Sequence, residues 1–287
     1  MQNRGRFMSI LKDNPDSKSQ KGIDRTLQDR NVQKSISAVK HKFLVMSSQG
    51  GVGKSSVVVN LTLTLSKRGL KVGLLDFNFH SPDIHRMLGL EPPAAWDPNK
   101  RYMPTAYSDD LKVASIEPVM PGRDATGVRR KPLKISDVSW FISSMSWNYL
   151  DYLFIDTPPG PGEGLITLAR AIPEAKAIIV TVPNKIHTNR AKAMINFFKK
   201  ENIPIFGWIE NMRGFLCQHC TRPLELFSTG CGSRAVFLMD IPFLGRIPID
   251  SYLAECGDAG EPFMDKYPDS QAAEAYELIV DNILKEH

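Results

Sequence analysis

Short apolar runs alternate with helical patterns from about residue 42 to the carboxyl end of the chain. Two stretches between these runs, 55–69 and 189–202, have the residue pattern of helices, and Gly69 marks the end of the first. The runs are continuously apolar, as in strands that are buried on both faces. The pattern therefore predicts an α/β fold with a mostly parallel, twisted sheet and helices on both of its faces. The predicted strands are 42–47, 71–77, 151–156, 175–182, 204–211 and 243–248.

Two stretches interrupt this alternation. Residues 91–134 are rich in proline, charge and turn-forming residues, which predicts an elaborated loop or hairpin region. Residues 212–240 contain a C-x-x-C sequence, Cys217 and Cys220, and no clear strand–helix unit. Insertions of this kind on a rigid scaffold often carry function. We expect one domain over residues 39–287, with a cysteine-bearing insertion near 212–240.

The composition is typical of a globular protein, with 42% hydrophobic and 23% charged residues in a chain of 287. No apolar run reaches the ~18 residues of a membrane span, and the first residues lack the apolar core of a secretory signal. Four cysteines of unequal spacing suggest a site rather than a disulfide scaffold. We expect a cytoplasmic protein with no membrane partner.

The amino-terminal segment differs from the rest of the chain in its charge. Residues 1–42 contain ten Lys or Arg against four Asp, with few large apolar side chains. This composition predicts a flexible, basic lead-in over residues 1–38. The segment has neither interleaved aromatic residues nor a nucleic-acid reader motif, so a solvated tail is favoured and nucleic acid is not an expected partner.

The sequence GGVGKSS, residues 50–56, follows a predicted strand and opens a predicted helix. In that context glycines let backbone N–H groups surround phosphate oxygens, and the helix amino terminus adds partial positive charge. Lys54 would neutralise the β- and γ-phosphates of a nucleotide, and the Ser55 hydroxyl would bind Mg²⁺. The alternative is a glycine-rich turn without a ligand. The intact Gly53-Lys54-Ser55 sequence and its flanks favour nucleotide binding.

The strict phosphate-loop pattern is not met, because Ser48 occupies the position of its first glycine. The stretch instead resembles the variant loop K-G-G-V-G-K-S/T of the MinD/ParA-like ATPases. Two further elements resemble that class, one beginning at Asp76 and the other the sequence IDTPPG, residues 155–160. In this comparison Asp156 would hold the water shell of Mg²⁺, and Asp76 would orient the attacking water. The segment TPPG, residues 157–160, would sense the γ-phosphate.

Within that class the chain resembles the Mrp/ApbC family of iron–sulfur cluster carrier ATPases. The resemblance runs from about Val39 to the carboxyl end. Five blocks carry it in order and spacing: KHKFLVMSSQGGVGKSSVVVNL, SPDIHRMLGL, DYLFIDTPPGPGEG, WIENMRGFLCQHC and FLGRIPIDSYLAECGDAGEPF. Together these blocks are far more specific than the phosphate loop alone.

The resemblance implies a homodimer that binds ATP at each phosphate loop. Cys217 and Cys220 of both subunits would together hold one [4Fe–4S] cluster, which needs four thiolates. The cluster would pass to apoprotein clients or assembly proteins. Asn211 matches the residue expected to recognise adenine. The implied ATP-binding residues are Gln49, Gly50, Gly51, Val52, Gly53, Lys54, Ser55, Ser56 and Asn211.

The cysteines also allow other interpretations. A zinc site could combine Cys217 and Cys220 with Cys231 and either His219 or Cys256. Such a structural Zn²⁺ would suit a nucleotide-gated regulatory or positioning switch of the MinD/ParA kind. A thioredoxin-like redox pair is disfavoured, because the C-x-x-C does not open a helix after a strand.

Two positions depart from the family pattern, and both bear on ATP hydrolysis. Gln49 replaces a lysine that would reach the partner's phosphates, and Asn78 replaces the second carboxylate of a D-x-D sequence. Losing cationic help of this sort can slow phosphoryl transfer by about 10³-fold or more. With a catalytic group of Lys54, Asp76 and Asn78, we expect ATP binding to be retained and hydrolysis to be slow. The alternative is that a neighbouring Arg or Lys, such as one of residues 129–131, supplies the missing charge.

The implied bridging cluster makes a prediction about subunit association. Thiol cross-linking should yield a dimer that is lost on Cys217→Ala or Cys220→Ala, because both cysteines would lie at the two-fold axis. The products can be resolved by non-reducing electrophoresis and sedimentation. A chain that stays monomeric at all concentrations, with and without ATP and cluster, contradicts the bridging arrangement.

Overall fold

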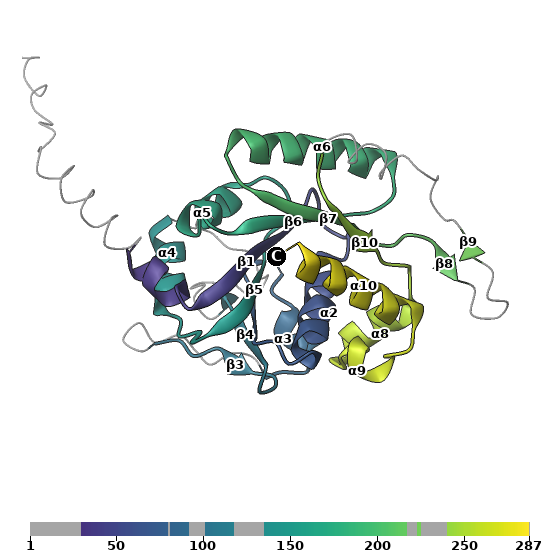
Figure 1. Ribbon diagram of the computed structural model, residues 1–287, viewed down its shortest axis with the longest axis horizontal. Coiled ribbons are helices and arrows are strands. Elements are labelled where there is room, and N and C mark those ends of the chain that lie inside the picture. Colours follow the sequence, from purple (N-terminus) through teal and green to yellow (C-terminus); the bar gives the residue numbers. More distant parts are fainter. Residues whose placement is uncertain are drawn as a thin grey trace, which may run out of the picture.

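The computed structural model describes residues 30–79, 81–91, 101–117, 135–216, 223–224 and 240–286. An eight-stranded sheet forms its centre, and every neighbouring pair of strands is parallel except the last, which is antiparallel (Figure 1). This confirms the predicted fold class. In spatial order the strands are β10 (Phe243–Arg246), β7 (Ile205–Glu210), β6 (Lys176–Thr181), β1 (Val39–Ser47), β5 (Leu150–Asp156), β2 (Val72–Asp76), β4 (Leu111–Ser115) and β3 (Thr105–Ala106).

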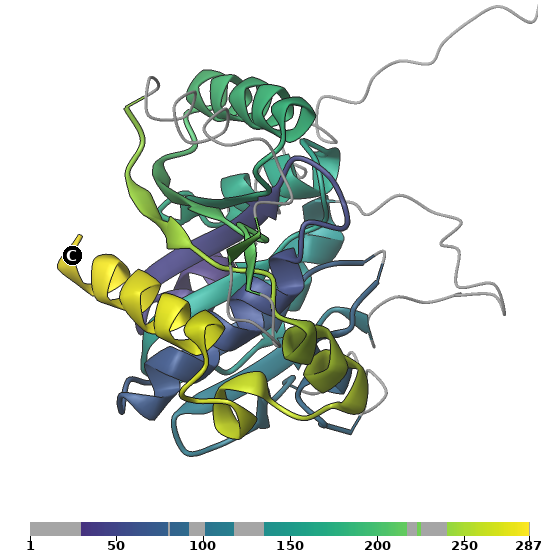
Figure 2. The same cartoon turned by 90° about the vertical axis from the view of Figure 1, so that its right-hand side faces the viewer.

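Helices cover both faces of the sheet, and each face has its own apolar core (Figures 1 and 2). The alternation of side chains along the strands explains the division: Phe43 and Val45 of β1 enter one core, whereas Leu44 and Met46 enter the other. The first core contains α2 (Lys54–Lys67), α3 (Ile84–Met87), α8 (Ser251–Ala259), α9 (Phe263–Lys266) and α10 (Gln271–Lys285). The second contains α4 (Ile135–Ser144), α5 (Glu163–Ala171) and α6 (Lys185–Lys200).

Helix α2, which follows the glycine loop, is buried along most of its length, from Val57 to Ser66. It packs against the sheet and against α10, which lies beside it on the same face and also contacts β10. At its end Arg68 pairs with Glu277 and Asp281 of α10. Gly69 then adopts the left-handed conformation, with φ = 79°, that commonly ends a helix. The helix predicted over 55–69 is confirmed, and its packing against the sheet and α10 holds it in place after the glycine loop.

The stretch predicted as an elaborated loop or hairpin region, 91–134, contains an antiparallel pair, β3 with β4, and β4 is also a strand of the main sheet that the sequence pattern missed. β4 pairs with β2 in parallel along its whole length, and β3 adds a short antiparallel strand beside it. Residues 92–100 and 118–134 of this stretch lie outside the described part of the chain.

In the predicted insertion 212–240, the structure describes a short antiparallel pair, β8 (Phe215–Leu216) with β9 (Pro223–Leu224). Figure 1 places this pair at the periphery of the molecule, beyond β10. In sequence, Cys217 and Cys220 fall between its two strands. These two cysteines and Cys231 lie outside the described residues.

The end of the predicted lead-in is structured, which corrects its boundary. Residues 30–36 form a helix, and Val32 and Ile36 are fully buried in the core with α4 and α5. The Ser35 hydroxyl donates a hydrogen bond to the Ile142 carbonyl at 2.8 Å. Val32 and Ile36 are four residues apart and therefore share one face of the helix. Two apolar side chains among polar and charged neighbours were too few to predict this helix from the sequence. Residues 1–29 lie outside the described part of the chain.

None of the helices within the described ranges is long and apolar enough to cross a lipid bilayer.

Burial of Ile36 makes a prediction about stability. Ile36→Ala should lower the free energy of unfolding by about 2–5 kcal/mol, because it leaves a cavity in the core beneath α4 and α5. Lys34→Ala, on the exposed side of the same helix, should change it by less than about 0.5 kcal/mol. Urea unfolding of the two variants gives the comparison. Equal stability of both variants would show that the 30–36 helix does not pack on the domain.

Candidate nucleotide site

The loop between β1 and α2 lies at the carboxyl edge of the parallel strands, where ligands bind in open α/β sheets. Gly51 and Gly53 have φ values of 78° and 74°, a conformation that glycine adopts without strain. A Cβ atom at Gly53 would overlap the side-chain amide of Asn211. Gly53 caps α2 without a side chain, so the first N–H groups of the helix remain available to an anion.

Lys54, Ser55 and Asp156 form one buried cluster. The Lys54 ammonium pairs with Asp156 Oδ1, and their side chains are only 6% and 1% exposed. The Ser55 hydroxyl donates to Asp156 Oδ2 at 2.6 Å. The structure thus brings together the predicted phosphate anchor and both predicted magnesium ligands.

Asp76 lies beside this cluster, opposite Asp156 in the register of β2 and β5. Burial is the main reason that the pKa of Asp76 is raised well above its ordinary value, and the Asp156 carboxylate is the second. Hydrogen bonds from the backbone N–H groups of Asn78, at 3.0 Å, and Ile84, at 3.1 Å, act in the opposite direction. Because both oxygens accept backbone hydrogen bonds, Asp76 also fixes the turn that carries Asn78.

The residues at this edge fit Mg²⁺, a cation that prefers oxygen ligands. Ser55 and Asp156 supply a hydroxyl and a carboxylate next to the loop. The side-chain oxygen of Asn78 is buried and has no hydrogen-bond partner within the described part of the chain. An orphaned oxygen of this kind suits a bound water or ion.

The sequence Thr157–Gly160 packs directly on the start of the loop. The Thr157 hydroxyl donates to the Val45 carbonyl at 2.9 Å, and Gly160 N–H donates to the Ser47 carbonyl at 2.8 Å. These hydrogen bonds connect the phosphate loop directly to Thr157–Gly160, the segment that was expected to sense the γ-phosphate.

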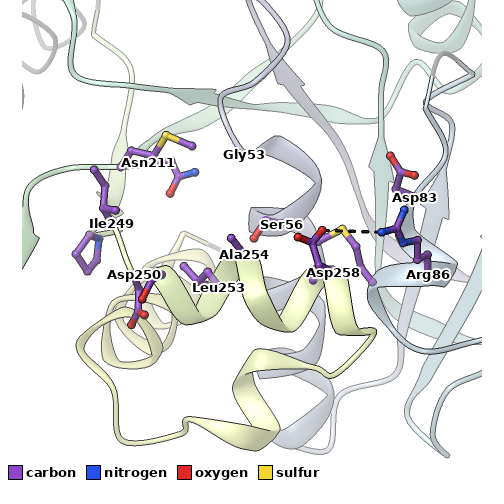
Figure 3. A pocket seen from close by; sticks show the side chains of 15 residues that line it. Gly53, Ser56, Asp83, Arg86, Asn211, Ile249, Asp250, Leu253, Ala254 and Asp258 are labelled. Atoms are coloured by element: carbon purple, nitrogen blue, oxygen red, sulfur yellow. Dashed lines mark ion pairs between the residues drawn. The ribbon is translucent and has the colours of Figure 1, made fainter. Parts of the chain in front are cut away.

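A cavity of about 540 Å³ adjoins the loop, a volume within the range of small-molecule sites. Asn211 lines this cavity, and its side-chain amide donates to the Val52 carbonyl at 2.9 Å. Figure 3 shows Asn211 and Ile249 on one side of the cavity, Ser56 of α2 behind it, and Arg86 with Asp258 on the other side. Its remaining lining residues are Gly53, Asp83, Met87, Met212, Pro248, Asp250, Ser251, Leu253, Ala254 and Gly257.

The wall of this cavity is continuous with the segment that leads to the C-x-x-C. Arg213 N–H donates to the Ile247 carbonyl, and Ile249 N–H donates to the Gly214 carbonyl, both at 2.8 Å. A β-bridge then joins Phe215 to Ile249. Only Leu216 separates this anchored backbone from Cys217.

Of the cysteines, Cys256 lies within the described residues, so its surroundings can be compared with the predicted metal sites. Cys256 is buried in α8, and burial raises the pKa of its thiol, which supports a structural role and opposes membership of a zinc site. Across the described segments, no group of three or more His, Cys, Asp or Glu side chains is placed to hold a metal ion. The predicted ligands Cys217 and Cys220 fall outside those segments, so their assignment stays a prediction.

Sequence reasoning missed one contact at the rim of the loop. The guanidinium of Arg190, in α6, donates a hydrogen bond to the side-chain carbonyl of Gln49. The strand order could have predicted this contact, because α6 follows β6, which is the neighbour of β1 in the sheet. Segments that follow the carboxyl ends of adjacent parallel strands meet at one edge.

A glycine phosphate loop between the central strand and a buried helix, with an acidic residue closing the next strand, defines a P-loop NTPase. A family model described as "ParA: NUBPL iron-transfer P-loop NTPase" matches residues 38–284. The chain belongs to this family, and the resemblance to iron–sulfur cluster carrier ATPases is confirmed.

Individual relatives agree with the family model. The chain is 38% identical to an "Iron-sulfur cluster carrier protein" of Methanocaldococcus jannaschii, over 90% of this chain and 89% of the relative. It is 39% identical to the "Cytosolic Fe-S cluster assembly factor CFD1" of Kluyveromyces lactis, over 87% of this chain and 92% of the relative.

Solved structures give the same picture of the fold. A nucleotide-binding protein in complex with ADP from Archaeoglobus fulgidus superposes with a TM-score of 0.68 at 30% identity, covering 82% of this chain and 92% of that one. MinD from Pyrococcus furiosus, at 21% identity, has a TM-score of 0.62 over 86% and 99% of the two chains, and it supports the fold alone.

The buried Lys54 cluster predicts a strong effect on nucleotide binding. Lys54→Ala should reduce ATP affinity below detection in titration calorimetry, because it removes the charged anchor of the phosphates without a replacement. Lys67→Ala, at the far end of α2, is the matched control, since its pair with Asp265 is half-exposed and weak.

Circular dichroism should accompany this measurement, because Lys54→Ala leaves Asp156 buried without its cation. A folded Lys54→Ala protein that binds ATP as tightly as wild type would show that the loop is not the site.

Proposed function

We propose that this chain binds ATP at the candidate nucleotide site, with the phosphates in the glycine loop and the adenosine in the adjoining cavity. The observation that carries the proposal is the continuity of these two features: Gly53 and Ser56 of the loop are also walls of the cavity. Asn211 stands where they meet and serves as the residue that recognises adenine. The related structure from Archaeoglobus fulgidus, described as a complex with ADP, supports this assignment.

In this proposal the residues of the loop exchange partners when ATP binds. Lys54 leaves Asp156 for the phosphate oxygens, and Ser55 and Asp156 hold Mg²⁺, which supplies neutralising charge to the phosphates. Asp76, which lies opposite Asp156 in the strand register, orients a water molecule, with Asn78 beside it. The phosphate-sensing segment Thr157–Gly160 follows the loop through its hydrogen bonds.

The biological role in this proposal is that of an ATP-dependent iron–sulfur cluster carrier or scaffold in the cytoplasm. Two subunits hold one [4Fe–4S] cluster between them through Cys217 and Cys220 of each and pass it to apoproteins. Support comes from the family and from the names of relatives that are 35–39% identical to this chain. The peripheral position of β8 and β9, the strands on either side of the two cysteines, suits a contact between subunits.

Reconstitution with iron and sulfide under anaerobic conditions tests the role. The wild-type protein should take up about four iron and four sulfide per dimer and acquire the broad visible absorbance of a cluster. Both properties should be lost on Cys217→Ala or Cys220→Ala. Cys256→Ala is the matched control, because the Cys256 thiol is buried within α8 and should not contribute.

The same samples distinguish the main alternative, a nucleotide-gated switch with structural zinc. Stoichiometric zinc in both the purified and the reconstituted protein, without acid-labile sulfide, would contradict the carrier role and support the nucleotide-gated switch. Transfer of the reconstituted cluster to an apoferredoxin, followed by the spectrum of the acceptor, then tests the carrier role itself.

A further inference from the structure

A side-chain contact joins two residues 141 positions apart at the rim of the phosphate loop. Gln49 immediately precedes the glycines, and Arg190 lies in the second turn of α6. The Arg190 guanidinium donates to Gln49 Oε1. The side chain of Gln49 is partly buried, whereas that of Arg190 is exposed, so the guanidinium is accessible to a ligand at the loop.

The charges already present at the loop leave a need for a further cation. Lys54 and Asp156 carry opposite charges, so together they add no net positive charge to the loop. Asp76 adds a second acidic group opposite Asp156. A triphosphate brings several more negative charges to the same edge of the sheet. Catalysis of phosphoryl transfer depends on cations that stabilise the charge developing on the phosphates.

The chemistry of the contact suits Arg190 for this purpose. An arginine stays charged at every physiological pH and has five N–H donors, of which a bond to one carbonyl oxygen uses only one. Gln49 is neutral, so it orients the guanidinium without cancelling its charge, as a carboxylate would. A guanidinium held in this way can bind phosphate oxygens through two parallel hydrogen bonds.

We propose that Arg190 supplies positive charge to the terminal phosphate of bound ATP, and that Gln49 is the positioning residue that holds it at the loop. The inference rests on the proposed ATP binding and deepens it. It favours the interpretation in which a neighbouring cation replaces the missing lysine charge, with Arg190 in that role instead of residues 129–131.

Binding of ATP and of ADP, measured separately by calorimetry on the full chain with Mg²⁺ present, tests the proposal. Arg190→Ala should weaken ATP binding by about tenfold, as expected for loss of a charge-assisted contact, and leave ADP affinity nearly unchanged. The unchanged ADP affinity also shows that the variant is folded. Arg190→Lys should lose less, because it keeps the charge but not the paired donors.

Lys200→Ala is the matched control, because it removes one positive charge from an exposed site about 15 Å further along α6. It should bind both nucleotides as wild type does. Phosphate release at saturating Mg·ATP should follow the same order, with Arg190→Ala slowest.

A rescue experiment separates supply of charge from support of the loop. In the Arg190→Ala background, Gln49→Lys places a cation directly beside the glycines and should restore ATP affinity over ADP, the phosphate release rate, or both. A structural role for Arg190 gives no reason for such a rescue, so loss without rescue overturns the proposal.

Two other results are also decisive and can be told apart. If wild type binds both nucleotides and Arg190→Ala matches Lys200→Ala in affinities and in phosphate release, the inference about Arg190 is wrong and the nucleotide site stands. If wild type binds neither ATP nor ADP, the proposed function fails, and the inference fails with it.

Discussion

A buried ion pair between Lys54 and Asp156 is the interaction on which the rest of the site depends. Either charge alone in this position would cost several kcal/mol, because both side chains are almost completely removed from water. Lys54 is the first residue of α2, and Asp156 is the last residue of β5. Their pairing therefore ties the end of the glycine loop to the strand beside β1 and holds the phosphate cradle in place.

This arrangement turns nucleotide binding into an exchange of partners for residues that are already in place. Asp156 accepts hydrogen bonds from both Lys54 and Ser55, the two side chains assigned to the phosphates and the metal. The neighbouring Asp76 is buried with its oxygens bonded to backbone N–H groups. Preorganisation of this kind lowers the free-energy cost of ordering the loop when a ligand binds, although the ligand must compete with a carboxylate for Lys54.

Much of the fold and of the nucleotide site could be predicted from the sequence, because the signals were local. Continuous apolar runs identified the buried strands, and the context of Gly53-Lys54-Ser55 between a strand and a helix identified the loop. The features that could not be predicted are those that depend on partners far away in the sequence. β4 is short and contains polar residues, and it is a strand because it pairs with β2. Arg190 and the cavity wall at Pro248–Asp250 become part of the site only through the order of strands in the sheet.

The region between the nucleotide cavity and the cysteines shows how the two halves of the proposed function can influence each other. Met212 lines the cavity and has φ = 58°, a left-handed conformation that costs a non-glycine residue about 1–2 kcal/mol. Two residues before it, Glu210 is completely buried and pairs with Arg246 of β10. Immediately after it, the backbone of Arg213 and Gly214 is hydrogen-bonded to Ile247 and Ile249, and Ile249 lines the same side of the cavity as Asn211.

A ligand that touches Asn211, Met212 and Ile249 therefore acts on both sides of this strained turn at once. Strained residues persist only where their surroundings over-determine them, and they are common where a conformation must change. Three residues beyond Met212, Phe215 is joined to Ile249 by a β-bridge, and the next residue, Leu216, pairs with Pro223. In the proposed function, the backbone from Asn211 to Phe215 therefore links the nucleotide cavity directly to the segment that precedes the two cysteines in sequence.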